Sequence, residues 1–269
     1  MTSTITIYLE KIKQLHQAVV GNVYFKFFQH VKWKNKRAPP NCAYIPTNVE
    51  HCANVFTHGI WVMPSILGFL HLIERSRSFT QLWAALIYGT SLILIFTIST
   101  FFHSVFFFSK NAHLKDILHR CDRAMIYVFI AGSYFPWVTL KSCPEGTIAS
   151  NLSWIIWVLA FFGIVYQQIF HERYKKLETF FYCFMGTAPG LTILKNWTDF
   201  SGLVEIQAGG LIYGIGIIFF KSDGTIPCAH AIWHLFVAAA AGIHYNAILN
   251  HLYPVTETES KAIEYGPDL

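Results

Sequence analysis

Two histidines at the start of the last apolar stretch have the residue type and spacing of a metal site. His230 and His234 stand four positions apart, so a helix places both imidazoles on one face, one turn apart. Burying two imidazoles in a membrane costs several kcal/mol unless something satisfies them, and a metal ion does so while both stay neutral. Two histidines that bond to neighbouring carbonyls have the same spacing. Other residues must decide between these alternatives.

Three more residues bring the chemistry of a catalytic metal site to the same end of the apolar segments. His103 lies near the end of the second segment, and Asp122 stands just before the third. Three imidazoles with a carboxylate that holds a water are typical of a four-coordinate zinc site, in which the metal lowers the pKa of that water to about 7. Ser99 is placed for a hydrogen bond beside the metal, or equally for one to its own i−4 carbonyl. The competing candidate ligands are His113 and His119, whose side chains we expect to be solvated.

A second polar cluster opens the first apolar segment. Glu50, Asn54 and His58 follow one another at helical spacing, with Thr57 beside them. Polar groups inside a membrane are functional or tightly bonded. This face therefore predicts either a part in the site or hydrogen bonds that join neighbouring helices.

The composition shows that membrane helices must position these residues. Of the 269 residues, 54% are hydrophobic and only 13% are charged, and the mean hydropathy is +0.40, which is typical of an integral membrane protein. The net charge of +5 resides in short loops rather than in one basic stripe, which argues against nucleic acid as a partner. The six cysteines contain no C-x-x-C pair and indicate neither a zinc knuckle nor a disulfide framework.

Seven apolar segments predict the fold class, an all-α, seven-transmembrane helical bundle. Each segment reaches or approaches the ~20 residues that a spanning helix needs, and the alternating polarity of a membrane barrel is absent. The segments cover 54–73, 82–108, 124–140, 152–170, 177–194, 203–220 and 229–252.

The loop charges predict the orientation and the division of the chain. Lysine and arginine number 15 on the side of the amino terminus and 5 on the other side, which places the amino terminus in the cytosol. We therefore expect a cytosolic segment over 1–49, a seven-helix transmembrane domain over 50–253 and a short lumenal or extracellular tail over 254–269. Residues 5–29 predict either an amphipathic helix on the membrane surface or a cap on the bundle. The basic residues within 32–37 either contact anionic headgroups or form a solvated linker.

The separated motifs together resemble the progestin and adipoQ receptor family, which includes the hemolysin III proteins. These motifs are Glu50 to His58, Ser99-x-x-x-His103, Asp122 and His230-x-x-x-His234, in this order. More narrowly, the runs from His171 to Lys175 and from Phe219 to Val237 are similar to the monocyte-to-macrophage differentiation factor subgroup. The resemblance covers about residues 38–253.

The resemblance implies zinc ligands at His103, His230 and His234, with Ser99 and Asp122 around the metal-bound water. It also implies a multi-pass membrane protein that modulates kinase and Ras-type signalling, with cytosolic signalling proteins as partners, from Golgi and late endosome or lysosome membranes rather than the plasma membrane.

The resemblance also implies an alternative function, a zinc-dependent hydrolase that cleaves a ceramide-like lipid amide within the membrane, with Asp122 and Ser99 as catalytic residues. Its partners are membrane lipids and a sphingolipid or fatty-acid ligand. An apolar cavity beside the metal favours the hydrolase, whereas a filled bundle favours the signalling protein.

Overall fold

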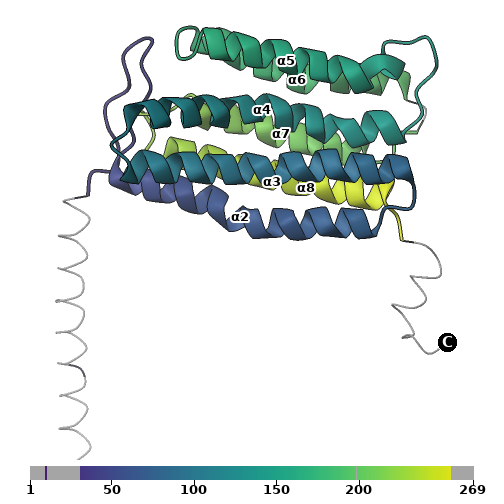
Figure 1. The fold of residues 1–269 in the computed structure, drawn as a ribbon, viewed down its shortest axis with the longest axis horizontal. Coiled ribbons are helices and arrows are strands. Elements are labelled where there is room, and N and C mark those ends of the chain that lie inside the picture. Colours follow the sequence, from purple (N-terminus) through teal and green to yellow (C-terminus); the bar gives the residue numbers. More distant parts are fainter. Residues whose placement is uncertain (1–9, 11–30, 198, 256–269) are drawn as a thin grey trace, which may run out of the picture.

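The described part of the chain is a bundle of α-helices, as the apolar segments predict. A computed structural model describes Glu10, residues 31–197 and residues 199–255, and these residues contain no strand. The helices lie side by side along one axis (Figure 1). They are α2 (Asn48–Glu74), α3 (Phe79–Phe108), α4 (Ala112–Leu140), α5 (Leu152–Ile169), α6 (Lys175–Asn196), α7 (Leu203–Phe220) and α8 (Ala229–Leu252), and the 3-10 helix η1 (Ala149–Asn151) precedes α5.

Five of these helices are long and apolar enough to cross a membrane. They are α2, α3, η1 continued by α5 (Ala149–Ile169), α7 and α8. The helices α4 and α6 fall outside this group, and α4 begins with a charged stretch that lowers its hydropathy. All six cysteines are free.

Helix α4 begins earlier than its apolar segment predicts. The Asn111 side chain caps it by accepting a hydrogen bond from the Leu114 amide at 3.1 Å. Asp116 and Arg120 form an i, i+4 ion pair at 2.8 Å, an arrangement that supports a helix in the charged stretch. Asp122 was expected where this helix starts, but it lies in its third turn.

The most tightly packed part of the bundle lies where α2 and α8 end. Leu72, Tyr88 and Ile248 are completely buried there, and α2 packs against both α3 and α8. At the opposite end α2 begins with a capping box, in which Thr47 and Glu50 satisfy each other's backbone amides. The first halves of α2 and α8 lie next to each other at this end of the bundle, which is also the end that carries the predicted site.

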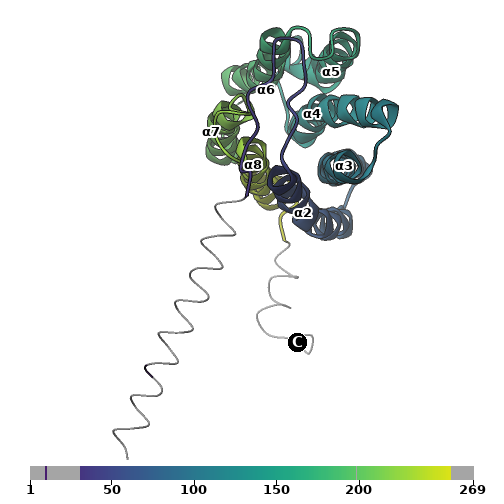
Figure 2. The same cartoon turned by 90° about the vertical axis from the view of Figure 1, so that its left-hand side faces the viewer.

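Residues 31–46 run across this same end of the bundle. Figure 2 looks onto the end and shows the segment crossing it before the chain enters α2. Lys34 donates to the Thr225 carbonyl at 2.7 Å, and Lys175 donates to the Cys42 carbonyl at 2.6 Å. Part of the basic cluster thus binds the chain itself. Apart from Glu10, the helix predicted over 5–29 lies outside the described residues, as does most of the predicted tail.

Candidate metal centre

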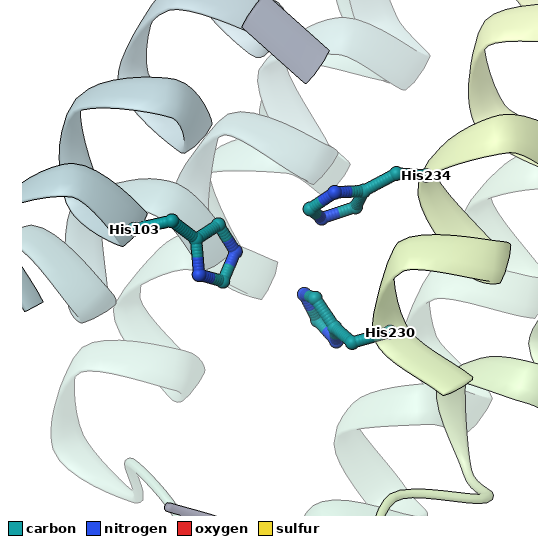
Figure 3. Close-up of side chains that lie close together, drawn as sticks. All are labelled: His103, His230 and His234. Carbon is teal, nitrogen blue, oxygen red and sulfur yellow. The ribbon is translucent and has the colours of Figure 1, made fainter. Parts of the chain in front are cut away.

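The three predicted histidine ligands come together between α3 and α8. His103 stands near the end of α3, and His230 and His234 occupy the first two turns of α8. One nitrogen of each imidazole lies within 4.8 Å of the others, and the three rings surround one small space (Figure 3). His103 and His234 are buried, with exposed fractions of 4% and 1%. His103 and His230 are 127 positions apart in sequence, yet their ring nitrogens belong to one compact group.

Polar side chains of α2 contact the outer nitrogen of two of these rings. The Thr57 hydroxyl lies 3.1 Å from Nδ1 of His234. The side-chain amide of Asn54 lies 3.5 Å from Nδ1 of His103. A metal-binding histidine usually donates the N–H of its other ring nitrogen to an acceptor. Thr57 can accept from Nδ1 of His234 and so leave Nε2 to a ligand. Asn54 would do the same for His103 only with its side-chain oxygen, which has no hydrogen-bond partner, turned toward Nδ1 in place of its nitrogen.

His230 has a carboxylate on the same outer nitrogen. Asp223, in the connection between α7 and α8, places Oδ2 3.8 Å from Nδ1 of His230. Burial, with Glu50 nearby, raises the pKa of Asp223 to about 7. A cation bound close by would favour the charged form of this carboxyl. All three histidines thus have Nδ1 directed to another side chain.

The unsatisfied atoms of the cluster fit a bound metal ion. Nε2 of His103 is buried and has no hydrogen-bond partner, and leaving such a group unpaired costs about 1–3 kcal/mol. Three neutral imidazoles form a donor set that suits zinc and related transition metals. The residues present therefore match a three-histidine metal centre with room for a further ligand.

Asp122 and Ser99 lie beside the three histidines. Asp122 is close enough to the Ser99 hydroxyl and to His230 to interact with both. Ser99 is only 1% exposed, and its Oγ has no hydrogen-bond partner of standard geometry. The structure thus brings together all five predicted site residues, on α3, α4 and α8.

One cavity of about 970 Å³ contains this whole group. Along α4 it extends from Asp122 to Trp137, or roughly 20 Å at the rise of an α-helix. Apolar side chains such as Ile126 and Phe129 line this length. On the opposite wall three glycines of α6 and α7 leave open space where a Cβ atom would stand: Gly186, Gly210 and Gly214. Its size and mostly apolar walls are those of a binding pocket for a small molecule.

The polar face of α2 both joins helices and belongs to the site. Asn54 and Thr57 connect α2 to the histidines of α3 and α8. The His58 ring stacks on the His234 ring, with centroids 3.6 Å apart and planes 19° apart. Glu50 instead accepts hydrogen bonds from the Thr47 amide and the Tyr44 hydroxyl. The side chains of Asn54, Thr57 and His58 thus join α2 to α3 and α8 through contacts with two of the three histidines.

A second cluster combines His119 with two residues of the α5–α6 connection. Nε2 of His171 lies 3.2 Å from Nδ1 of His119, and the ligand atoms of His119, His171 and Glu172 lie within 4.8 Å of one another. The expectation that His119 is solvated is therefore wrong: its ring is half-buried and stacks on Phe102 at 5.0 Å. His113 is exposed, as expected. The α5–α6 connection folds back onto α4, which is distant in sequence, and no local sequence pattern predicts this contact.

Charged groups already occupy this second cluster. Arg123 binds Glu172 at 2.6 Å and Glu178 at 2.8 Å, and Lys175 pairs with Glu172 as well. Burial alone would raise the pKa of Glu172, but Arg123 and Lys175 outweigh it and lower that pKa. Glu172 also adopts a left-handed backbone conformation, with φ of 63°, which is uncommon for a residue other than glycine. These ion pairs hold the connection in place.

Comparisons with known proteins agree with the motifs. The haemolysin-III-related family matches residues 47–245. The human protein called monocyte to macrophage differentiation factor is 47% identical over 226 residues, which cover 82% of this chain and 92% of the relative, and the mouse protein of that name gives the same values. The hemolysin-3 homolog of Bacillus subtilis is 35% identical over 205 residues, or 74% of this chain and 93% of the relative.

The match confirms the family that the separated motifs predicted. More than half of the chain lies within the family region, and the relatives are covered almost completely. The chain belongs to the haemolysin-III-related family. With its apolar helices, this membership identifies it as an integral membrane protein.

Proposed function

We propose that this member of the haemolysin-III-related family is a zinc-dependent hydrolase that cleaves a lipid amide, of the ceramide type, within the membrane. The observation that carries the proposal is the apolar cavity of about 970 Å³ that reaches the three histidines. A filled bundle would have favoured a purely structural metal. An acyl chain held along α4 would bring a polar amide beside Asp122 and Ser99.

The proposed topology has seven crossings and a cytosolic amino terminus. Five helices meet the length and composition of a span, and α4 and α6 run alongside them in the same bundle (Figure 1). The distribution of 15 and 5 basic residues supports the orientation. It places the candidate metal centre near the cytosolic face. Tags on the two termini, probed after selective permeabilisation, would test this, and a lumenal signal from the amino-terminal tag would overturn it.

The chain's own residues have distinct roles in the proposed reaction. His103, His230 and His234 would hold zinc, which acts when bound as a Lewis acid that polarises a carbonyl and lowers the pKa of water. Asp122 takes a proton from the attacking water at a carboxylate oxygen and passes it to the departing nitrogen. The Ser99 hydroxyl donates a hydrogen bond to the amide carbonyl oxygen. Water adds to the carbonyl carbon and the C–N bond breaks, which yields a fatty acid and an amine.

Modulation of kinase and Ras-type signalling stays a prediction of the family resemblance. No feature of the described residues identifies a protein partner, so the geometry favours the hydrolase. Golgi and late endosome or lysosome membranes remain the predicted location, and membrane lipids with a sphingolipid or fatty acid remain the predicted partners. Imaging the tagged chain with organelle markers would test the location.

The decisive experiment separates metal binding from chemistry. Purified wild type and Asp122→Ala are compared for zinc content and for hydrolysis of a short-chain ceramide. We expect the variant to keep its zinc and to lose about 10²–10⁴-fold in rate. Asp116→Ala is the matched control, because Asp116 is exposed on the same helix. If the wild type hydrolyses no lipid amide, or if Asp122→Ala loses its zinc as a histidine variant would, the hydrolase is abandoned and a structural zinc with a signalling role is retained.

A further inference from the structure

The Thr57 hydroxyl stands between a backbone carbonyl and a candidate metal ligand. Its Oγ1 donates to the Ala53 carbonyl at 2.8 Å, with the Asn54 carbonyl at 3.3 Å as a second acceptor. The same oxygen lies 3.1 Å from Nδ1 of His234. A hydroxyl has one hydrogen and two lone pairs. Because carbonyls use that hydrogen, Thr57 can only accept from His234.

This hydrogen bond favours the proton on Nδ1 of His234, and the Asn54 carbonyl, which also interacts with His234, favours a ring N–H as well. A neutral imidazole has one N–H and one lone pair, so an N–H at Nδ1 leaves the lone pair at Nε2. His234 is 1% exposed, and the ring of His58 lies on its face at 3.6 Å. The ring can therefore neither turn freely nor exchange its partner for water. The protein itself sets the tautomer.

We propose that Thr57 is a positioning residue: it holds His234 in the Nδ1–H tautomer and so presents the Nε2 lone pair to the metal. The inference rests on the metal site of the proposed function but not on the hydrolytic reaction. It also gives the polar face of α2 a defined task. Without the Thr57 acceptor, His234 would keep only the weaker contact with the Asn54 carbonyl. The proton would then move more readily to Nε2, where it would have to leave before a metal could bind.

Two substitutions at one position test the hydroxyl itself. Thr57→Val keeps the shape of the side chain and removes the acceptor, whereas Thr57→Ser keeps the acceptor and removes a methyl group. We expect zinc affinity, measured by competition with a chelator, to fall about 10–100-fold in Thr57→Val and to stay within a few-fold of wild type in Thr57→Ser. Thr100→Val is the matched control, because the Thr100 hydroxyl also donates to its i−4 carbonyl, that of Phe96, and is not the hydrogen-bond partner of His103 or His234.

A spectroscopic measurement on the wild type avoids any effect of substitution on folding. Imidazole ¹⁵N shifts of histidine-labelled, zinc-free protein report which nitrogen of His234 bears hydrogen, and we expect Nδ1. Hydrogen on Nε2, unchanged affinity in Thr57→Val, or equal losses in Thr57→Ser and Thr57→Val would each overturn the proposal. A wild type that binds no zinc would overturn both this proposal and the proposed function. A wild type that binds zinc but hydrolyses no ceramide would remove the reaction alone and leave this proposal standing.

Discussion

The two histidine clusters at the same end of the bundle contain similar ligand atoms at similar distances, yet their surroundings differ. In each, the ligand atoms lie within 4.8 Å of one another. The hydrogen-bond partners of His103 and His234 are the neutral side chains of Asn54 and Thr57, and Nε2 of His103 has no partner. Around His119 and His171 the neighbouring side chains include Arg123 and Lys175. The first cluster lacks a positive charge, and the second already contains one.

Short distances between ligand atoms do not by themselves identify a metal site. Arg123 donates to Nε2 of His119 at 3.2 Å and also binds Glu172, so it occupies the position that a cation would take. Gln167 contacts the remaining nitrogen of His171 at 3.0 Å. A divalent ion there would have to displace a guanidinium from a buried carboxylate. The first cluster therefore fits the proposed metal better, and the ion pairs of the second fit a structural role.

The largest expected effect comes from removing one histidine from each cluster. His230→Ala should lower zinc affinity by more than about 100-fold, because a neutral ligand is lost from a buried centre. His171→Ala, its matched control, should keep about one zinc per chain. Elemental analysis after dialysis against a chelator measures both. One zinc per chain in His230→Ala would show that the ligand assignment is wrong. Two zinc ions per chain in the wild type would show that the second cluster binds metal as well, so that the two clusters do not differ in this respect.

A smaller effect is expected from removing the charge at the second cluster. Arg123→Met leaves Glu172 and Glu178 buried without their guanidinium, which should cost about 3–5 kcal/mol of unfolding free energy. Thermal unfolding in detergent would measure the loss as a lower Tm. Arg120→Met is the control, because Arg120 pairs with the more exposed Asp116, where about 1 kcal/mol or less is expected. Equal Tm values for the two variants would show that the second cluster does not hold the α5–α6 connection.

Acidification should weaken the second cluster by the smallest amount. Burial and then Arg123 lower the pKa of His171 to about 4, whereas in the unfolded chain it is about 6.5. Between these values the unfolded state binds more protons, so stability falls as pH decreases from about 6.5 to about 4. We expect a contribution of about 1 kcal/mol, since the ring is only half-buried. The Tm of His171→Asn should fall less between pH 7 and pH 5 than that of wild type, and parallel curves would refute this.

Local sequence predicted the helices well where apolar residues define them. The segments expected at 203–220 and 229–252 coincide with α7 and α8. Helix α4 begins before its predicted segment because hydropathy detects the apolar part of a helix and not the charged turns that Asn111 caps. Capping and ion pairs stabilise the helical conformation of charged turns, and a hydropathy profile detects neither of them.

The closeness of the three histidines was predictable from the sequence, but the side chains that contact them were not. An i, i+4 spacing places His230 and His234 on one face by helix geometry alone. Which side of α2 turns toward them depends on packing against α3 and α8, so the contacts of Asn54 and Thr57 required the structure. The second cluster depends on the folding of the α5–α6 connection back onto α4, a contact between residues 52 positions apart.

Thr57 and His234 lie far apart along the chain, so Thr57 is synthesised well before His234. They are 177 residues apart, so at 5–20 residues per second roughly 10–35 s pass between their appearance at the ribosome. During that time the polar face of α2 has no histidine of α8 to contact. A chain that stops before α8 carries only one of the three ligands, His103. Under the proposed function, zinc occupancy would thus distinguish finished molecules from nascent ones.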